Sequence, residues 1–482
     1  MVIAQLLTWV LLVTAVNGAM AAEELLQNRE LRDWADGKPA EWQIETGATS
    51  GSTRESIVQP LDGGGVELRG DNQTGVWRIV QQRVDIQPGV TYRLGFTAAA
   101  KGVRREAKQF NNCYVGVFLA DAAGKRKGIE FRTIFEPTAV SGQLVFAAPE
   151  AATRADVMLF LSQTGTLRVQ ELSLTRVEPR DSFRLLVEEL GRYYSFLQLK
   201  GIDWTMETDA VRVAAESANS PETFVAAVKP LLARLEDLHV SCVLPSGEAI
   251  PMYISRADPN FQARAVAQQL EDVNQVGRMG FVGRTAEGYG YAALGTLSVD
   301  NQTATRFVEA FEGLLDAPAL IVDLRVNGGG TESLAQEIVS RLTDQPVLYA
   351  RNQVRCGPAP DDLLTISERI LSPHATVRYT KPVAVLIGPK CVSSGEGMAL
   401  MLKTLPHAKL FGQSTRGASG NPRPIGLPNG VAVHYSTWIS LTPDDRPIEG
   451  IGVVPDVTID DDPTGEKGLD EAIGWLDGQT RR

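Results

Sequence analysis

Two patterns of hydrophobic and polar residues divide the chain. From residue 26 to residue 177, apolar and polar positions alternate in short runs that end at Gly, Asn or Asp, for example at residues 75–86, 91–102, 113–124 and 167–177. Alternation with a period of two predicts β-strands, and regularly spaced strands with turn residues between them predict an all-β sandwich. We therefore expect a β-sandwich domain over residues 23–178.

Beyond residues 177–180 the spacing of the apolar residues becomes helical. Residues 181–198 and 220–238 both carry this spacing, and the second segment starts with Ser-Pro and has Glu222 in its first turn. Such a start is typical of a helix N-terminus. We expect a helical segment over residues 179–245.

From residue 246 to residue 482, strands and helices alternate. The apolar runs 288–299, 319–326 and 381–388 are each followed by a segment with helical spacing. This alternation predicts an α/β domain with a parallel sheet covered by helices. Ligands of such sheets bind at the carboxyl ends of the strands, where the loops NGGGT (327–331) and CVSSGEG (391–397) both lie.

The N-terminus predicts export to the periplasm or the extracellular space. Residues 6–16 form an apolar run too short to span a bilayer, and the small residues 19–21 precede two acidic residues. This pattern is typical of a signal peptide, here residues 1–22, although no Lys or Arg precedes the apolar run. The alternatives are an uncleaved anchor or a first core strand. After cleavage we expect no membrane span.

The amino-acid composition limits which partners and cofactors are expected. The formal net charge of −11 disfavours nucleic acid and anionic membranes as main partners. The four cysteines allow three disulfide pairings, and their spacing favours none. Because the sequence has no zinc-type cysteine and histidine cluster, no GxGxxG and no phosphate loop, we expect neither a metal nor another cofactor.

The two loops at the predicted strand ends carry residues suited to acyl transfer. Gly328, Gly329 and Gly330 end one strand, and glycines let backbone N–H groups turn toward a ligand. Ser393 and Ser394 lie between the next strand and a helix, where a serine can be an N-cap or a nucleophile. Together the loops make a candidate oxyanion hole, with the N–H after the nucleophile as the second donor.

A nucleophilic serine needs a base, and the chain has four histidines. His239 ends the predicted helix and leads into a strand, His374 and His407 lie in connections, and His434 lies within a strand. A lone histidine at a helix C-terminus is more often a favourable partner of the helix dipole than a catalyst.

Several motifs resemble one peptidase family. The segments 319–330, 383–396, 410–422 and 448–457 occur in the order found in C-terminal processing (tail-specific) peptidases and the tricorn core protease. Residues 193–204 and 235–240 resemble the N-terminal helical part of that family. The resemblance runs from about residue 181 to the C-terminus. It implies a ClpP/crotonase-like α/β catalytic domain and a peptide or protein substrate.

The resemblance also implies site residues. The family nucleophile lies three residues before a glutamate, so Glu396 selects Ser393 as the nucleophile. Ser394 then supplies an oxyanion N–H together with Gly328, Gly329 and Gly330.

The sequence departs from processing peptidases at the base. Their lysine position corresponds to Ala418, and Arg416 cannot replace it because a guanidinium stays protonated. The tricorn-like branch instead uses a histidine, matched by His239, and an acid, matched by Glu449. A serine that precedes the histidine in that branch is Leu238 here. The carboxylate that orients His239 is therefore left open between Glu449 and Asp237.

A second departure concerns substrate recognition. Only about fifty residues separate His239 from the predicted sheet, so no complete PDZ module is expected and recognition of a free peptide carboxylate is not carried over. The N-terminal part resembles carbohydrate-binding jelly-roll modules and could bind a polysaccharide. Its aromatic residues could stack on sugars or belong to the core: Trp34, Trp42, Trp77 and Tyr114.

We expect an exported serine-type peptidase that acts through an acyl-enzyme on Ser393, with His239 as base. One alternative is a catalytically inactive peptidase fold that binds a glycan or a peptide. The other is a crotonase-type acyl-CoA enzyme, because that fold shares an oxyanion site with two N–H donors.

Overall fold

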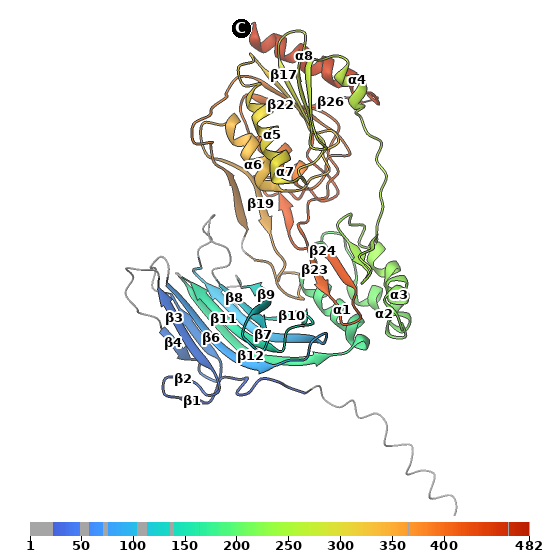
Figure 1. Ribbon diagram of the computed structural model, residues 1–482. Coiled ribbons are helices and arrows are strands. Elements are labelled where there is room, and N and C mark those ends of the chain that lie inside the picture. Colours follow the sequence, from blue (N-terminus) through green and yellow to red (C-terminus); the bar gives the residue numbers. More distant parts are fainter. Residues whose placement is uncertain are drawn as a thin grey trace, which may run out of the picture. The chain divides into compact units, whose positions relative to one another are not determined.

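The computed structural model describes residues 23–48, 57–70, 76–103, 113–134, 139–162, 164–364, 366–460 and 462–481 (Figure 1). The predicted signal peptide lies outside the described residues. The chain divides into two compact units. One runs to Ser182 and includes Gly426–Asn429, and the other comprises the rest.

The N-terminal unit consists mainly of two five-stranded antiparallel sheets. The first has the order β10-β7-β12-β5-β4, with β10 (Val140–Ala147), β7 (Thr91–Lys101), β12 (Thr166–Val177), β5 (Val66–Arg69) and β4 (Ile57–Pro60). The second has the order β3-β6-β11-β8-β9, with β3 (Gln43–Ala48), β6 (Val76–Asp85), β11 (Arg154–Ser162), β8 (Cys113–Ala120) and β9 (Arg126–Thr133). A small hairpin joins β1 (Trp34–Ala35) to β2 (Lys38–Pro39).

Alternation within the strands supplies the core of this unit. In β7, Leu94 and Phe96 are buried, and in β8, Val115 and Val117 are buried, so that both sheets contribute to one hydrophobic cluster. Successive side chains of a strand point to opposite faces, which is why a period of two marks a sheet with one buried face.

The aromatic residues considered for sugar stacking have different positions. Trp42 is a core residue with 1% of its surface exposed, and Trp34 packs against the same core. Tyr114 is half-buried and stacks on Phe160, with ring centroids 4.6 Å apart. The side chain of Trp77 lies outside the described residues.

The second unit begins with three helices: α1 (Ser182–Tyr193), α2 (Trp204–Glu216) and α3 (Pro221–Ala233). Asp203 caps α2 by accepting from Met206 N–H (3.0 Å), and Ser220 caps α3. Because α3 ends at Ala233, it is shorter than the helix predicted over residues 220–238, and His239 lies in a turn rather than at a helix end. Glu236 has a left-handed φ of 45°, which breaks the helical path before this turn.

A seven-stranded sheet forms the centre of the second unit, in the order β15-β16-β17-β18-β21-β22-β26. Its strands are β15 (Glu271–Val276), β16 (Gly280–Arg284), β17 (Gly290–Leu294), β18 (Leu320–Asp323), β21 (Val383–Ile387), β22 (Ala408–Gly412) and β26 (Val457–Thr458). The strands from β17 to β26 are parallel, as the alternation of strands and helices predicts. β15 and β16 form an antiparallel edge.

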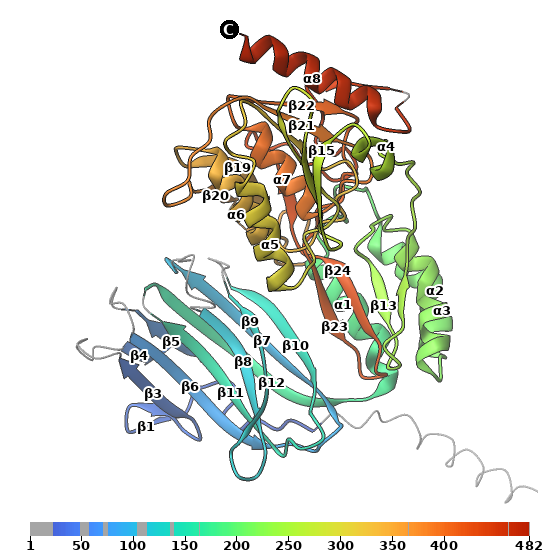
Figure 2. The ribbon, with the colours of Figure 1, turned by 45° about the horizontal axis from the view of Figure 1, so that its top comes forward.

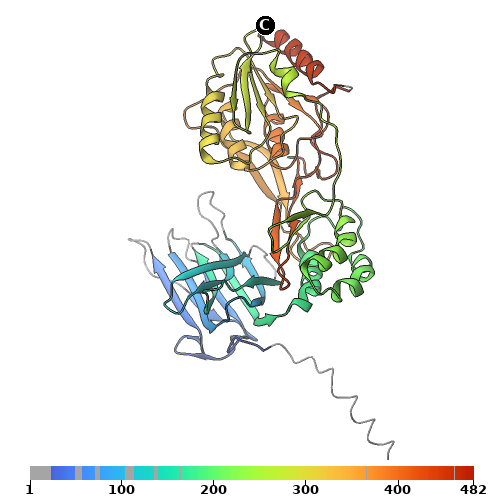
Figure 3. The ribbon, with the colours of Figure 1, turned by 45° about the vertical axis from the view of Figure 1, so that its right-hand side comes forward.

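Helices cover both faces of this sheet (Figure 2). One face packs against α5 (Asn301–Glu312), α6 (Glu332–Val339) and α7 (Ser394–Lys403), and the other against α4 (Ala263–Ala267) and α8 (Glu466–Thr480). In β21, Val383 and Val385 face the first layer and Ala384 and Leu386 the second, so the strand is apolar throughout. Figure 3 shows α5 (yellow) and α8 (red) on opposite sides of the sheet.

Two smaller sheets complete the unit. The first has the order β14-β13-β24-β23, with β14 (Ala249–Pro251), β13 (Ser241–Val243), β24 (Ala432–Ser436) and β23 (Pro422–Gly426). The second has the order β20-β19-β25, with β20 (Ser367–Leu371), β19 (Val347–Gln353) and β25 (Ile439–Leu441).

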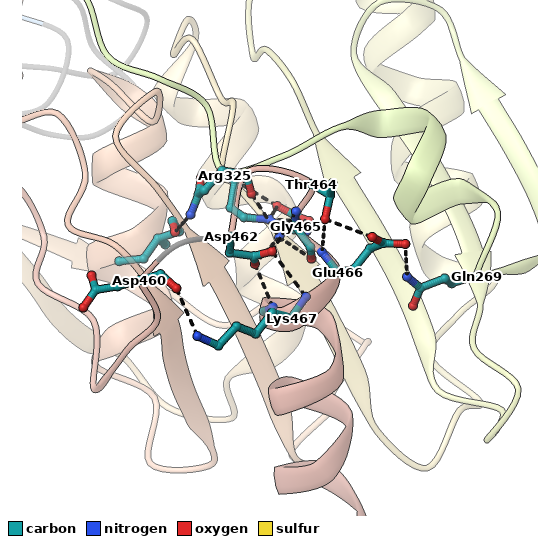
Figure 4. Close-up of polar contacts among 12 residues, drawn as sticks. Gln269, Arg325, Asp460, Asp462, Thr464, Gly465, Glu466 and Lys467 are labelled. Carbon is teal, nitrogen blue, oxygen red and sulfur yellow. Dashed lines mark hydrogen bonds and ion pairs between the residues drawn. The ribbon is translucent and has the colours of Figure 1, made fainter.

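A buried arginine fixes the end of β18 and the start of α8 (Figure 4). Arg325 is 1% exposed, pairs with Asp323 and donates to Gly465 O at 2.7 Å. Asp462 accepts from the N–H groups of Gly465 (2.9 Å) and Gly468 (2.8 Å) at the N-terminus of α8. Because Arg325 lies three residues before Gly328, these contacts also help to fix where the glycine turn begins.

Candidate active site

Ser393 lies at the turn between β21 and α7 with a strained backbone. Its φ is 59° and its ψ −126°, while Ser394 already begins the helix. A non-glycine residue held in such a sparsely populated region costs about 1–3 kcal/mol, and such residues cluster at active sites. Ser393 N–H donates to Ala418 O at 2.9 Å, which helps to hold the turn.

Glu396 connects this turn to the loop that contains Ala418. Its buried carboxylate accepts from Thr415 Oγ1 (2.7 Å), Gly417 N–H (2.6 Å) and Ala418 N–H (2.9 Å). Burial raises the pKa of Glu396, and these hydrogen bonds oppose the rise. In the sequence, Glu396 served only to identify the nucleophile. In the structure, it also anchors the loop 415–418.

The glycine turn lies directly against Ser393. A Cβ atom added to Gly329 would be 2.8 Å from both Ser393 Cβ and Val392 O, and Gly329 has a left-handed φ of 78°. Glycine is therefore needed here both for the backbone conformation and for the close approach.

The four predicted oxyanion donors differ in the partners they already have. Gly328 N–H donates to Gly295 O, and Gly329 N–H donates to Asn327 Oδ1, both at 2.9 Å. Within the described part of the chain, the N–H groups of Gly330 and Ser394 have no such partner. Ser394 Oγ donates to Gly330 O at 2.7 Å, so these two residues adjoin.

His239 and Asp237 form a second cluster in the turn before β13. Asp237 is fully buried, and its Oδ1 lies 3.5 Å from His239 Nδ1 and accepts from His239 N–H at 2.8 Å. Burial alone would lower the pKa of His239, but Asp237, then Glu449 and Glu396, raise it above its usual value. Burial would likewise raise the pKa of Asp237, but His239 and Ser436 bring it below its usual value.

Glu449 interacts with the same cluster electrostatically, because its charge raises the pKa of His239. Its Oε1 pairs with Lys200 Nζ at 2.8 Å, and the ammonium group also donates to Leu235 O (2.9 Å) and Glu236 O (3.1 Å). Burial, with the charge of Asp237, raises the pKa of Glu449 to about 7 although Lys200 and His239 oppose the rise. No hydrogen bond joins Glu449 to His239 in the described structure, so Asp237 is the carboxylate in contact with the histidine.

Residues next to both clusters line one pocket of about 760 Å³, although Ser393 and His239 themselves do not. Leu238, Ala418 and Glu449 line it, so it passes beside His239 and beside the residue that holds Ser393. Sequence reasoning missed Lys200 and the buried Tyr194. Burial and the charges of Asp237 and Glu449 raise the Tyr194 pKa well above its usual value.

The described residues offer neither a metal site nor a membrane-spanning helix. They contain no group of three or more His, Cys, Asp or Glu side chains able to hold a metal ion. They also contain no helix with the length and hydrophobicity that crossing a membrane requires.

Comparison with known proteins shows a similarity between part of the α/β domain and one peptidase family. The profile of peptidase family S41 matches residues 288–459. A carboxy-terminal-processing protease of Bartonella bacilliformis is 24% identical over 155 residues, which are 32% of this chain and 34% of the relative. A CtpA-like protein of Staphylococcus aureus strain N315, named a probable serine protease, is 27% identical over 143 residues, 29% of this chain and 27% of the relative.

The matched segment thus spans about a third or less of the length of these curated relatives. A crystal structure from Parabacteroides merdae, assigned as a peptidase, has a TM-score of 0.55 and 25% identity, and covers 62% of this chain and 97% of that one. The segment 288–459 is therefore similar to peptidase family S41 and to proteins named as proteases.

Proposed function

We propose that the chain hydrolyses peptide bonds through an acyl-enzyme on Ser393. The observation that carries this proposal is the left-handed backbone of Ser393, held between Gly329 and Ala418 at the end of β21. A serine that served only as an ordinary N-cap would adopt an extended backbone instead.

The proposed reaction follows the usual course of serine acyl transfer. His239 takes the proton of Ser393 Oγ as this oxygen attacks the scissile carbonyl carbon. The N–H groups of Gly330 and Ser394 donate to the resulting oxyanion. His239 then gives the proton to the leaving amine, and a water molecule hydrolyses the acyl-enzyme with the histidine again as base.

The two carboxylates take different roles in this proposal. Asp237 orients His239 and stabilises its protonated form, because its Oδ1 lies next to His239 Nδ1 and binds the backbone N–H. Glu449 adds negative charge, but its contact is with Lys200.

A histidine base corresponds to the tricorn-like branch. The lysine position of processing peptidases is occupied by Ala418, which is 4% exposed. Lys200 is the amine in the pocket, and its three contacts with oxygen atoms are those of a protonated ammonium group rather than a base.

A fluorophosphonate probe tests the proposal because it reacts only with an activated serine. We expect covalent labelling of the wild type at one residue, loss of labelling in Ser393→Ala, and retained labelling in Ser394→Ala. Absence of labelling in a folded wild type would favour the inactive binding protein. Turnover of acyl-CoA thioesters without turnover of peptides would favour the crotonase-type enzyme.

The N-terminal unit and the predicted signal peptide extend the proposal to location and targeting. We propose export on the basis of residues 1–22 and a jelly-roll module that can bind polysaccharide. Because Trp42 lies in the core, Tyr114 is the residue through which a glycan is best tested. Retention on insoluble polysaccharide, lost in Tyr114→Ala, is the expected result, whereas binding to no glycan on an array contradicts it.

A further inference from the structure

The pocket beside the candidate active site has a charged wall. It extends from Ala418 and Glu449 to the first turn of α2, and its cationic side chains are Lys200, Arg234 and Arg416. A substrate residue next to the scissile bond would enter this pocket, since Ala418 O binds the backbone of Ser393.

The three cations differ in their partners. Lys200 pairs with Glu449 at 2.8 Å, and Arg234 pairs with Glu207 at 3.2 Å. Arg416 has no ion pair among the described residues, and its Nη2 atom is buried without a hydrogen-bond partner. Its backbone N–H donates to Cys391 O at 2.8 Å, which fixes the residue relative to the serine turn.

The buried Nη2 atom of Arg416 is in an unfavourable environment, because it has lost water without gaining an acceptor. Its planar set of donors matches a carboxylate with two parallel hydrogen bonds. The alanine at position 418 leaves space beside it, where a long side chain would occupy the pocket.

None of the acidic residues that line the pocket pairs with Arg416 in the described structure. Asp203 caps α2 through Met206 N–H, and Glu207 is paired with Arg234. Glu449 is paired with Lys200, and the exposed Glu236 also lines the pocket. These carboxylates disfavour an anion elsewhere in the pocket, so an anionic group is favoured only where it reaches Arg416.

We propose that Arg416 selects substrates with an aspartate or glutamate side chain next to the scissile bond. This inference rests on the proposed peptidase function and adds a substrate class to it.

Fluorogenic peptides that carry Glu, Gln or Lys at each position around the cleavage point test the proposal. For the wild type we expect kcat/KM to favour Glu over Gln by about ten- to hundredfold at one position. Arg416→Gln should bring this ratio close to one, and Arg416→Glu should favour Lys. The matched control Arg234→Gln removes a paired cation from the same pocket and should keep the preference for Glu.

A ratio near one in the wild type, or an unchanged ratio in Arg416→Gln, overturns the proposal. Thermal melting of each variant verifies its fold, and the charge reversal gives a result that misfolding cannot imitate.

Binding of the fluorescein-labelled peptides to Ser393→Ala gives a readout independent of turnover. Equal Kd values for Glu and Gln peptides contradict the role of Arg416. A Glu preference in binding without any turnover or probe labelling by the wild type supports that role but removes the proposed peptidase function.

Discussion

Replacing Gly329 by alanine tests whether the glycine turn serves catalysis or only the fold. The added Cβ would lie 2.8 Å from Ser393 Cβ and from Val392 O, whereas ordinary contacts are 3.4–4 Å. The turn must therefore move by about 0.6 Å or more relative to the nucleophile. The left-handed φ of 78° adds a cost of about 1–2 kcal/mol for an L-residue.

The expected effect on the rate follows from this displacement. A misplacement of about 1 Å in an active site can cost about 10²-fold, and loss of an oxyanion donor costs about 10²–10³-fold. We expect Gly329→Ala to lower kcat by about 10- to 100-fold with little change in KM. The second-order rate of fluorophosphonate labelling should fall in parallel.

Gly247→Ala is the matched control. Gly247 has a φ of 87° in the hairpin between β13 and β14, and an added Cβ would meet nothing within 4 Å. This variant carries the same backbone strain without the contact and should keep its activity while its Tm falls. If Gly329→Ala retains kcat within twofold of this control, the turn is not part of the catalytic machinery; if KM alone rises, the turn binds substrate.

Three further variants test the rest of the site. His239→Ala should lower kcat/KM by several orders of magnitude. In the wild type, activity should rise with pH through a pKa above about 6.5, because the neutral histidine is the base and the neighbouring carboxylates raise its pKa. Near-normal turnover of His239→Ala refutes the assignment. Lys200→Met should lower the free energy of unfolding in urea by about 1–3 kcal/mol above pH 7, where Glu449 is ionised, and by less below pH 7, where Glu449 is protonated. The double variant Lys200→Met/Glu449→Gln should recover part of that loss. Equal losses at both pH values contradict the pairing. Glu396→Gln should cost about 1–3 kcal/mol and slow probe labelling, because an amide cannot accept from all four donors of the carboxylate, which include Ser393 N–H. Unchanged labelling indicates that Glu396 does not position Ser393.

The sequence predicted the features that depend on local patterns. Alternation in strands such as β7 and β8, and the apolar run of β21, marked the sheets because burial on one or both faces is visible within a few residues. The turn at Ser393 and the glycine turn were predicted because both lie at the carboxyl ends of parallel strands.

Features that depend on contacts between distant segments were not predicted. Lys200 has no local signal, since its role comes from a tertiary contact with Glu449. The early end of α3 depends on the left-handed turn at Glu236. The sequence left the carboxylate partner of His239 open, because Asp237 lies two residues before the histidine whereas Glu449 was implied only by the family resemblance. In the structure it is Asp237 that contacts the histidine.

The hydrogen bonds of Glu396 have a consequence for how such sites diverge. The loop from Thr415 to Ala418 is held through one hydroxyl and two backbone N–H groups, none of which belongs to the side chain at position 418. Substitution at this position therefore leaves the anchoring of the loop intact. Under the proposed assignment of His239 as base, a lysine at position 418 can be replaced and the base supplied by another segment while this loop keeps its fold.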